Sequence, residues 1–468
     1  MAPSIAEGAL FLQKDEKGTC PLFHLLELLM EKRTAAFHNL GCKVNAYEME
    51  GMEEALRNAG YEIVPFSEKA DVYVINTCTV TRVADQKSRQ MISRAKTLNP
   101  DAIVVACGCY ANTGKDVLIR DGVADLILGN NEKSHLNEEI EKLRAKRSTD
   151  ADAKETFVPD INKGKFDFEE TGFSIKEEHT RAFIKVEDGC NQFCSYCIIP
   201  FARGRERSRD PQKVVEEVQG LVKQGFSEFV LTGIRLTSYS YEGLTLVDLI
   251  EEVSRVNGVR RIRLGSLEPS AVTEDFAKRL SALPNMCPHF HMSLQSGSAT
   301  VLKRMNRNYT PDEFMEAIGY LRQYFDDPAI TADMICGFPG ETEDEFHESL
   351  DFAKEVGFYE IHVFPYSVRQ GTRAERMPGQ LSKKQKAERT RVLRDEATQL
   401  KMDYLKRHTD MRSEALLEEK EAQNGREYWT GYTPEYIRVL YDSDEDLSGH
   451  FVEGTLGQIE DGYMHLKS

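Results

Sequence analysis

The sequence contains one tryptophan and no long hydrophobic run. Its longest early apolar stretch, residues 22–30, is interrupted by His24 and Glu27 and is much shorter than the roughly 20 apolar residues that cross a bilayer. The first residues lack the basic and apolar regions of a secretory signal peptide. We therefore expect no membrane contact and a reducing, cytoplasmic location, where clustered cysteines indicate metal or redox chemistry more often than disulfides.

The composition excludes several further classes of protein. Hydrophobic residues make up 40% and charged residues 29%, which is typical of a globular chain and not of a disordered or collagen-like one. At roughly 100–200 residues per domain, this length indicates about three domains. The formal net charge of −17 argues against a nucleic-acid partner for the chain as a whole, so only locally basic segments could support one.

The first part of the chain alternates short apolar runs with amphipathic stretches. Residues 1–32 form an N-terminal extension of unassigned role, and residues 33–146 carry the alternation. Alternating strands and helices predict an α/β domain with a doubly wound parallel sheet. Residues 147–180 are polar and charged, so we expect a linker there. The predicted strands of the sheet are 35–37, 72–75, 102–106 and 126–128.

A second alternating series fills residues 181–407. Its six strand–helix units are too few for the usual eight-unit barrel, so the pattern favours a partial, open barrel. Residues 408–468 change character to short strands separated by Gly and Asp turns, which predicts a small all-β barrel or sandwich. The barrel strands are expected at 181–187, 228–232, 260–264, 289–295, 329–335 and 359–365, and the final strands at 428–432, 436–440, 450–456 and 463–466.

Cys190, Cys194 and Cys197 are separated by four and three residues and share one short loop. Three thiolates at this spacing suit a [4Fe–4S] cluster with one iron left open, as in a catalytic centre. A structural zinc site would want four N or S ligands, and no fourth ligand lies close in the sequence. Three unrelated buried cysteines are the remaining alternative.

A second set of cysteines is dispersed along the chain. Cys42, Cys78 and Cys109 each follow the carboxyl end of a predicted parallel strand. Because those ends meet at one crevice of an open α/β sheet, the three thiols could converge there. Cys107 competes with Cys109, although a continuing strand would bury it. Spacing alone leaves a second metal site and three core thiols as equal alternatives.

The first cysteine loop resembles the signature of the radical S-adenosylmethionine (SAM) superfamily, with Tyr196 as the aromatic residue before the last cysteine. The resemblance implies that SAM chelates the open iron and is cleaved to a 5′-deoxyadenosyl radical, while the barrel positions the cofactor and excludes water. It also implies the following SAM contacts: Tyr196, Thr232, Gly233, Ser266, Glu268, Gln295 and Asp333.

Motifs over roughly residues 34–468 are similar to those of the methylthiotransferase family. The similarity implies a second [4Fe–4S] cluster on Cys42, Cys78 and Cys109, and a C-terminal TRAM domain. The motifs are Leu40-Gly-Cys-Lys-Val-Asn45, Asn76-Thr-Cys-Thr-Val-Thr81, Gly108-Cys-Tyr-Ala111, Ile199-Pro-Phe-Ala-Arg203 continuing to Arg209, Ser293-Leu-Gln-Ser-Gly297, Leu302-Lys-Arg-Met-Asn-Arg307 and Gly337-Phe-Pro-Gly-Glu-Thr342.

These motifs most resemble the branch of the family that methylthiolates C2 of N6-threonylcarbamoyladenosine at position 37 of tRNA. The branches acting on isopentenylated adenosine and on a ribosomal protein aspartate usually carry YGCQMN and LGCPKN in the first block, where this chain has LGCKVN. Both stay as alternatives, together with a non-catalytic iron–sulfur RNA-binding regulator. The resemblance implies a tRNA anticodon loop and a reducing electron donor as partners, and the oligomeric state is not indicated.

Basic residues gather in two places despite the acidic total. Arg203, Arg205, Arg207 and Arg209 follow the cluster loop, and we expect them to contact RNA phosphates. Residues 369–407 hold twelve Lys and Arg against five Asp and Glu, either as a second RNA contact or as a solvated helix face. Residues 408–468 hold five basic against fourteen acidic residues, so we expect them to contact the barrel or a partner instead of RNA.

Overall fold

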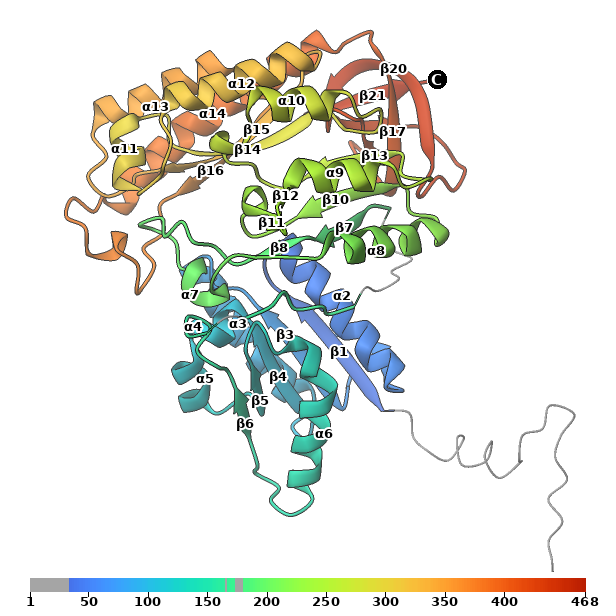
Figure 1. Cartoon of the computed structure of the whole chain (residues 1–468), viewed down its shortest axis with the longest axis vertical. Helices are drawn as coiled ribbons and strands as arrows, with labels where there is room; N and C mark the ends of the chain where they lie inside the picture. The colour runs from blue at the N-terminus through green and yellow to red at the C-terminus, as the bar shows by residue number, and fades with distance from the viewer. Residues whose placement is uncertain (1–32, 165, 173–179) are drawn as a thin grey trace, which may run out of the picture.

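The computed structural model describes residues 33–164, 166–172 and 180–468 (Figure 1). The extension expected at residues 1–32 lies outside the described residues. The chain forms a smaller N-terminal domain below a larger body, which contains an open barrel and a small closed β-barrel (Figure 1). In the described part of the chain, no helix combines the length and apolar composition needed to cross a membrane.

The N-terminal domain is the predicted doubly wound sheet, with six parallel strands in the order β2-β1-β3-β4-β5-β6. Successive strand residues alternate between two apolar layers: α2 and α6 cover one face, and α3, α4 and α5 cover the other. The strands are β1 (Thr34–Asn39), β2 (Glu62–Val64), β3 (Val72–Thr77), β4 (Ile103–Gly108), β5 (Leu126–Leu128) and β6 (Glu155–Phe157). The helices are α2 (Lys43–Asn58), α3 (Arg82–Leu98), α4 (Cys109–Thr113), α5 (Lys115–Asp121), the 3₁₀ turn η1 (Lys133–His135) and α6 (Leu136–Arg147).

The linker expected at residues 147–180 is wrong for its first part. Strand β6 pairs in parallel with β5 and extends the sheet, with Leu126 opposite Glu155. Its three residues are mostly exposed and carry no apolar alternation, and the strand is held by its pairing with β5 and by an ion pair between Glu155 and Lys146. Farther along, the side chains of Ile161 and Glu169 are buried, so these residues pack against the protein and are not part of a free linker.

The second domain is the predicted open barrel. Its six parallel strands form two three-stranded ladders, β13-β10-β7 and β14-β15-β16, joined by the isolated parallel bridges Ile262↔Met286 and Leu267↔Met292. Among the described residues no ladder joins β7 to β16, which leaves the barrel open on that side. The strands are β7 (Ala182–Lys185), β10 (Glu228–Thr232), β13 (Arg261–Leu264), β14 (His289–Gln295), β15 (Ala329–Cys336) and β16 (Glu360–Pro365).

The barrel helices begin where the sequence supplies capping residues. Thr310, Thr342 and Ser382 form capping boxes with the Glu or Gln three positions later. The helices are α7 (Ile199–Arg203), α8 (Pro211–Lys223), α9 (Leu246–Ser254), α10 (Glu274–Ser281), α11 (Ala299–Arg304), α12 (Pro311–Tyr324), α13 (Glu343–Val356) and α14 (Lys383–Arg407). Two-residue strands β8 (Glu187–Asp188) and β9 (Arg207–Ser208) pair beside the cysteine loop.

The C-terminal residues form a closed five-stranded barrel in the order β17-β18-β19-β21-β20. Its first strand, β17, was not predicted, because the sequence Arg412-Ser-Glu-Ala-Leu-Leu-Glu-Glu-Lys-Glu-Ala-Gln423 consists largely of helix-forming residues. Closure of the barrel decides its conformation by pairing both of its edges. The strands are β17 (Arg412–Gln423), β18 (Arg426–Tyr432), β19 (Arg438–Tyr441), β20 (Phe451–Glu460) and β21 (Tyr463–Lys467).

The acidic C-terminal barrel docks on the amino ends of the open barrel's strands. Arg261 donates to the carbonyls of Glu414 (2.7 Å) and Tyr432 (2.9 Å), and Arg263 donates to that of Thr433 (2.7 Å). Buried Glu228 lies 2.7 Å from Arg263 and offsets its charge. The C-terminal domain therefore contacts the barrel, as its acidity led us to expect, on the side opposite the cysteine loop.

Candidate iron–sulfur and S-adenosylmethionine site

The dispersed cysteines converge at the carboxyl edge of the N-terminal sheet. Cys42 is the N-cap of α2, Cys78 directly follows β3, and Cys109 follows β4 as the first residue of α4. The pKa of the Cys78 thiol is raised by burial and also by the neighbouring Cys109 and Cys42. Cys107 lies instead in the apolar core, with its thiol 3.6 Å from the carbonyl of Ile75.

Cys42 lies at the junction of the two domains, near Arg203 and Cys109. Its side chain is exposed to solvent, although the surrounding protein raises the pKa of its thiol through desolvation. This combination is expected of a residue that lines a cavity. Helix α4, which begins at Cys109, packs on α7, which follows Cys197, so the two cysteine sets meet at the domain junction (Figure 1).

The cysteine loop between β8 and α7 is tightly folded. The Cys197 N–H donates to the carbonyl of Cys194 (2.9 Å), and the Gln192 N–H donates to the thiol of Cys190 (3.4 Å). A Cβ at Gly189, where φ is +86°, would lie 2.0 Å from the carbonyl of Arg205, so only glycine fits there. The loop is therefore held between the barrel and the chain that follows it.

Two thiols of this loop are protonated without a metal. Burial, with a smaller contribution from the neighbouring Cys194, raises the pKa of Cys190 and of Cys197 to about 12 each. Metal binding must therefore displace protons from these thiols, because thiolate is the ligand form.

The donor set fits a polynuclear cluster better than a single ion. Among the described residues, no three Cys, His, Asp or Glu side chains lie close enough to hold one metal ion. A zinc ion requires its thiolates about 2.3 Å from one centre. A cubane cluster instead accepts each thiolate on a different iron. The ligand roles of Cys42, Cys78, Cys109, Cys190, Cys194 and Cys197 remain predictions.

Arg203 lies between the two cysteine sets and is fully buried. Its Nε donates to the Cys109 thiol (3.3 Å), and its terminal nitrogens donate to Glu48 (2.7 Å) and Asp188 (3.1 Å). A guanidinium whose donors are occupied inside the protein does not reach an RNA phosphate, so the expected RNA contact of Arg203 is wrong.

Two more of the four arginines are also buried. Arg207 pairs with Asp188 (3.0 Å), and Arg209 pairs with Glu170 (2.7 Å) and with Glu217. Because their carboxylate partners lie far away in the sequence or across a turn, the sequence pattern indicated exposed arginines. Only Arg205 is exposed, where its guanidinium stacks 4.5 Å from the Phe193 ring centroid.

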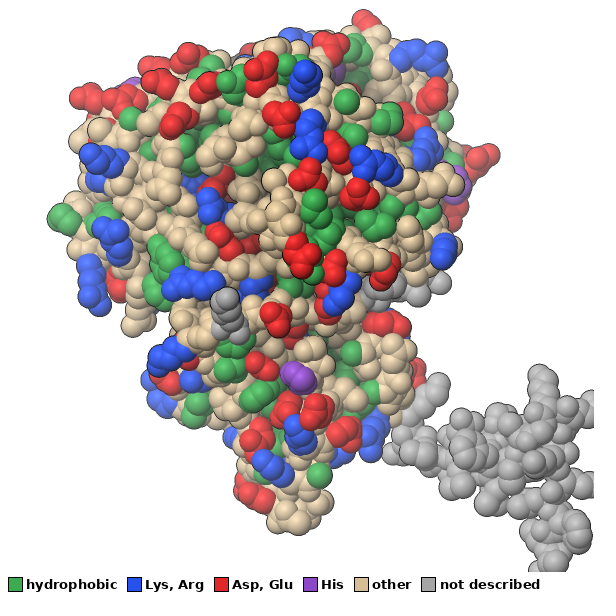
Figure 2. All heavy atoms as spheres, in the orientation of Figure 1, with side chains coloured by type: hydrophobic (Ala, Val, Ile, Leu, Met, Phe, Trp, Pro, Cys, Tyr) green, Lys and Arg blue, Asp and Glu red, His purple; other side chains and the backbone are tan. Residues whose placement is uncertain are grey.

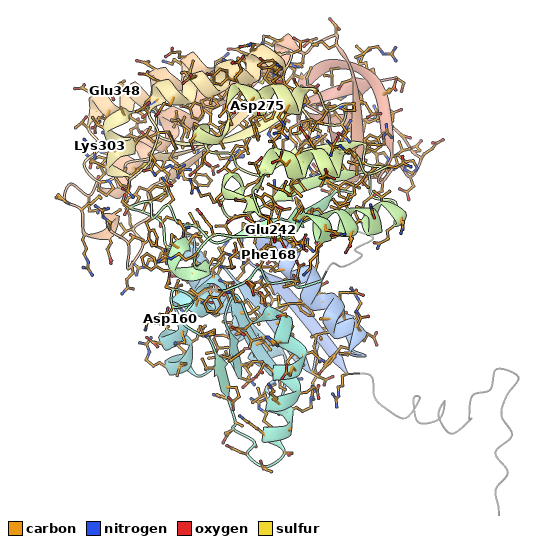
Figure 3. The ribbon with its side chains drawn as sticks, viewed as in Figure 1. Asp160, Phe168, Glu242, Asp275, Lys303 and Glu348 are labelled. Atoms are coloured by element: carbon orange, nitrogen blue, oxygen red, sulfur yellow. The ribbon has the colours of Figure 1, made fainter. Side chains whose placement is uncertain are left out.

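Glu48 on α2 joins the two domains through a buried charge network. Its carboxylate accepts from Lys133, Lys185 (2.7 Å) and Arg203. Burial alone would raise the pKa of Glu48, but the three cations more than offset it and hold that pKa below its usual range. Phe168, labelled at the domain junction in Figure 3, covers Lys185 at 5.0 Å. No local pattern marks Glu48 or Lys185, so sequence reasoning missed both.

The predicted SAM residues lie near the carboxyl ends of the barrel strands. Thr232 ends β10 and is buried, and a Cβ at Gly233 would come within 2.8 Å of the Glu187 carboxylate. The Ser266 hydroxyl lies 2.6 Å from that of Ser293. These residues therefore surround the segment that leads into the cysteine loop.

The other predicted contacts lie on the second ladder and in the loop itself. Gln295 ends β14 with a φ of +68°, a left-handed conformation that is unusual for this residue type. Asp333 on β15 lies 3.6 Å from Nε2 of His291. The Tyr196 ring packs edge-on against Phe338 at 6.4 Å. The structure brings these residues to one side of the barrel, and their contacts with SAM remain predictions.

Arg307 is a second arginine with a buried side chain that binds a cysteine, and the sequence analysis included it in a motif without assigning it a role. It donates to the Cys194 thiol (3.2 Å) and to the carbonyl of Ser293 (3.3 Å), and it lies 3.4 Å from Glu268. Each cysteine set therefore has one thiol that accepts a hydrogen bond from a buried arginine. Such bonds tune the reduction potential of thiolate-bound clusters.

Glu268, predicted to contact SAM, belongs to a chain of ion pairs. Arg235 lies 2.5 Å from Glu268 and 2.8 Å from Glu206, and Glu206 accepts from the side chain of Asn191 (2.9 Å). With Arg307 and Cys194, the chain begins and ends in the cysteine loop. These contacts hold the cysteine loop against the open barrel at Asn191 and at Cys194.

Comparison with known proteins identifies the families of the N-terminal domain and of the open barrel. Residues 184–353 match the radical SAM superfamily, and residues 34–129 match a family described as uncharacterized protein family UPF0004. A solved radical S-adenosylmethionine methyltransferase, TsrM from Kitasatospora setae with cobalamin and a [4Fe-4S] cluster bound, is similar with a TM-score of 0.54 at 16% identity. The match covers 71% of this chain and 75% of that one, and it shows the fold.

Curated relatives span nearly the whole chain. Threonylcarbamoyladenosine tRNA methylthiotransferase MtaB of Bacillus subtilis is 41% identical over 424 residues, which cover 90% of this chain and 93% of the relative. MtaB of Aquifex aeolicus is 37% identical and covers 82% and 93%. The tRNA-2-methylthio-N(6)-dimethylallyladenosine synthase of Moorella thermoacetica is 31% identical and covers 91% and 96%. The chain therefore belongs to the radical SAM methylthiotransferase family.

Proposed function

We propose that this methylthiotransferase modifies C2 of N6-threonylcarbamoyladenosine at position 37 of tRNA. Relatives with the corresponding name are 35–41% identical over most of the chain, which supports this substrate. The observation that carries the proposal is the meeting of the two cysteine sets at one domain junction, bridged by Arg203. Because the chain is an enzyme of this family, the alternative of a non-catalytic regulator is not retained.

The enzyme uses SAM and [4Fe–4S] clusters. Cys190, Cys194 and Cys197 would hold the cluster that binds SAM, and the dispersed set would hold the second. When bound, these groups supply the radical chemistry and the sulfur that an unactivated C–H bond requires. Arg203 and Arg307 orient one cysteine of each set by hydrogen bonding, and the apolar barrel core excludes water.

Lys43 supports the threonylcarbamoyl substrate over a dimethylallyl one. It follows Cys42, its side chain is exposed, and burial together with Arg181 and Arg263 lowers the pKa of its ammonium. No ion pair involves Lys43 among the described residues. A threonylcarbamoyl group carries a carboxylate and a dimethylallyl group carries none. The Lys43 ammonium lies 5.7 Å from the centroid of the Phe183 ring, and we propose that it pairs with the substrate carboxylate.

The remaining partners follow from this reaction. An unpaired anticodon loop lets the target base leave its stack at low cost. A reducing electron donor must supply the cluster. Free thiols and clusters suit the cytoplasm, which is the location we propose. We assign the C-terminal closed barrel as the TRAM domain from its position at the end of the family pattern.

Nucleoside mass spectrometry of tRNA from a deletion strain tests the function. We expect 2-methylthio-N6-threonylcarbamoyladenosine to disappear and to return when the gene is restored. Its persistence without a second such enzyme would contradict the proposal. Loss of 2-methylthio-isopentenyladenosine, or of a modified ribosomal protein aspartate, would instead point to one of the other two branches.

A further inference from the structure

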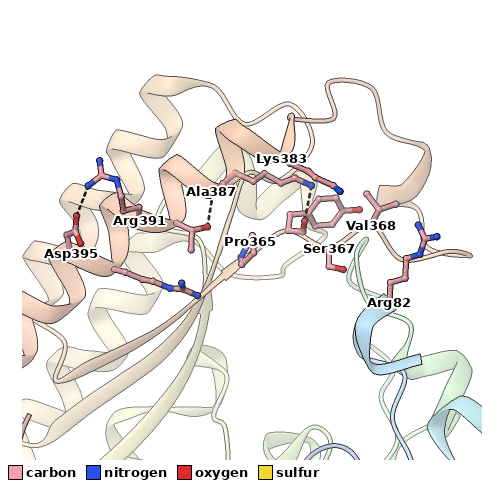
Figure 4. A pocket seen from close by; sticks show the side chains of 12 residues that line it. Arg82, Pro365, Ser367, Val368, Lys383, Ala387, Arg391 and Asp395 are labelled. Carbon is pink, nitrogen blue, oxygen red and sulfur yellow. Dashed lines mark hydrogen bonds and ion pairs between the residues drawn. The ribbon is translucent and has the colours of Figure 1, made fainter. Parts of the chain in front are cut away.

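A basic groove lies between the N-terminal domain and the rim of the barrel (Figure 4). It encloses about 680 Å³, and its walls come from the start of α3, the end of β16 and the outer face of α14. Five cationic side chains line it against one carboxylate, Asp395, which is paired 2.9 Å from Arg391. The cations are Arg82, Lys383, Lys386, Arg391 and Arg394.

The positive charge of the groove is only partly balanced within the protein: Arg391 pairs with Glu388 (2.7 Å) and Asp395 (2.9 Å), and the other four cations have no carboxylate partner among the described residues. Arg82 and Lys383 are exposed and form no ion pair in the described part of the chain. Lys386 donates to the carbonyl of Tyr366 (3.0 Å), and its pKa is lowered mainly by burial and also by the nearby Lys383. Within the described part of the chain, Arg394 donates to the carbonyl of Val363 (3.1 Å) and to no carboxylate. An anion in the groove would relieve this repulsion.

The two walls are fixed relative to each other. Arg369, in the loop after β16, is buried and donates to Asp85 (3.0 Å) and to Thr79 on the N-terminal domain. Asp85 belongs to the first turn of α3, next to Arg82. The spacing between the cations of the two domains is therefore set before a ligand arrives, which reduces the entropic cost of binding.

The groove lies beside the cysteine junction. Arg82 comes four residues after Cys78. On the other wall, the Tyr366 ring packs on Phe338 at 5.3 Å, and Phe338 packs on Tyr196 in the cysteine loop. Figure 2 shows Lys and Arg side chains gathered where the loop between β16 and α14 lies in Figure 1.

Exposed non-polar side chains accompany the cations. Phe364 is 49% exposed directly before the groove residue Pro365, and Val83 is 60% exposed beside Arg82. Cations that follow a phosphate backbone, next to an exposed aromatic ring on which a base can stack, are typical of sites for single-stranded nucleic acid. A small phosphorylated metabolite would not need this apolar rim.

We propose that the groove binds the phosphate backbone of the tRNA anticodon strand while the target base enters the space between the cysteine sets. The inference rests on the proposed function and assigns RNA-backbone binding to the α3–α14 groove. The acidic C-terminal barrel docks at the opposite ends of the barrel strands, away from this groove.

Fluorescence anisotropy with a labelled anticodon stem–loop RNA tests the groove, using full-length, cluster-reconstituted protein over a series of salt concentrations. We expect Arg82→Ala and Lys383→Ala each to weaken binding roughly three- to tenfold and to lower the slope of log K against log salt by about 0.7 per lost phosphate contact. Lys383→Arg keeps the charge and should restore most of the affinity. Lys278→Ala is the matched control, since Lys278 is exposed on α10, the helix of Asp275 in Figure 3.

Two results separate this inference from the proposed function. If the Arg82→Ala/Lys383→Ala double variant keeps the wild-type affinity and salt slope, the groove is not the RNA-binding site, even if the wild-type enzyme methylthiolates the RNA. Groove-dependent RNA binding by a wild-type enzyme that yields no 2-methylthio nucleoside would support the groove and refute the proposed function.

Discussion

The Nε atom of Arg203 lies 3.3 Å from the Sγ atom of Cys109. The two residues belong to different domains: Arg203 ends the helix after the cysteine loop, and Cys109 begins the helix after β4. The same guanidinium binds Glu48 and Asp188. One buried side chain therefore sets both the docking of the domains and the surroundings of a predicted cluster ligand.

We expect Arg203→Lys to lower the reduction potential of the N-terminal cluster, because a hydrogen bond to a ligating sulfur stabilises the reduced, more negative state. The measurement is a redox titration followed by electron paramagnetic resonance in a chain that carries Cys190→Ala, Cys194→Ala and Cys197→Ala. Arg205→Lys is the control, since Arg205 is exposed and outside the network. An unchanged potential would show that Arg203 does not act on Cys109.

Iron content distinguishes the two cysteines on either side of Gly108. The reconstituted wild-type chain should hold about eight irons in two cubanes. Cys109→Ala should lose one cluster and retain about four irons. Cys107→Ala should keep both clusters, because the Cys107 thiol is buried in the apolar core. Equal iron contents in the two variants would refute the assignment of Cys109.

Glu187 should make stability depend on pH. Burial raises the pKa of its carboxyl to about 8, and its Oε1 has no hydrogen-bond partner. From about pH 4.5 to about 8 the folded protein keeps a proton that the unfolded chain has lost, so stability falls as pH rises. The slope approaches about 1.4 kcal/mol per pH unit within this window and vanishes above it.

Glu187→Gln should remove this slope, since glutamine does not titrate. Urea unfolding of the anaerobic protein at about pH 5.5 and about pH 8 measures it. The exposed Glu242, labelled in Figure 3, supplies the control variant Glu242→Gln, which should keep the wild-type slope. Identical slopes in all three proteins would show that Glu187 is ionised in the fold.

Lys43 should decide whether the enzyme distinguishes a modified from an unmodified adenosine. We expect the wild-type enzyme to bind an anticodon stem–loop with N6-threonylcarbamoyladenosine about tenfold more tightly than one with adenosine, because a charge-assisted hydrogen bond forms. Lys43→Gln should lose that preference while binding the adenosine form as before. Lys69→Gln, at an exposed loop lysine, should keep the preference. A preference retained by Lys43→Gln would place the carboxylate elsewhere.

Apolar periodicity predicted four of the six strands of the N-terminal sheet and all six parallel strands of the open barrel. Five of the barrel strands fall within one residue of their expected limits, because buried parallel strands are nearly continuous apolar runs, and β7 ends two residues early. Strand ends also placed Cys42, Cys78 and Cys109 at one edge of the sheet, although spacing alone left a metal site and three core thiols as equal alternatives. The short edge strands β2 and β6 and the charged strand β17 escaped prediction, because neighbouring strands, and not local propensity, hold them in place.

The sequence by itself determined the two α/β units, the two cysteine sets and the family to which their spacing belongs, since these depend on local patterns and on chain order. Tertiary structure alone decided which charges are free. Three of four arginines after the cysteine loop are buried against carboxylates such as Glu48 and Glu217, and the open cations lie instead on α3 and α14. The physical reason is that a charge is neutralised by its neighbours in space, and those neighbours are distant in the sequence.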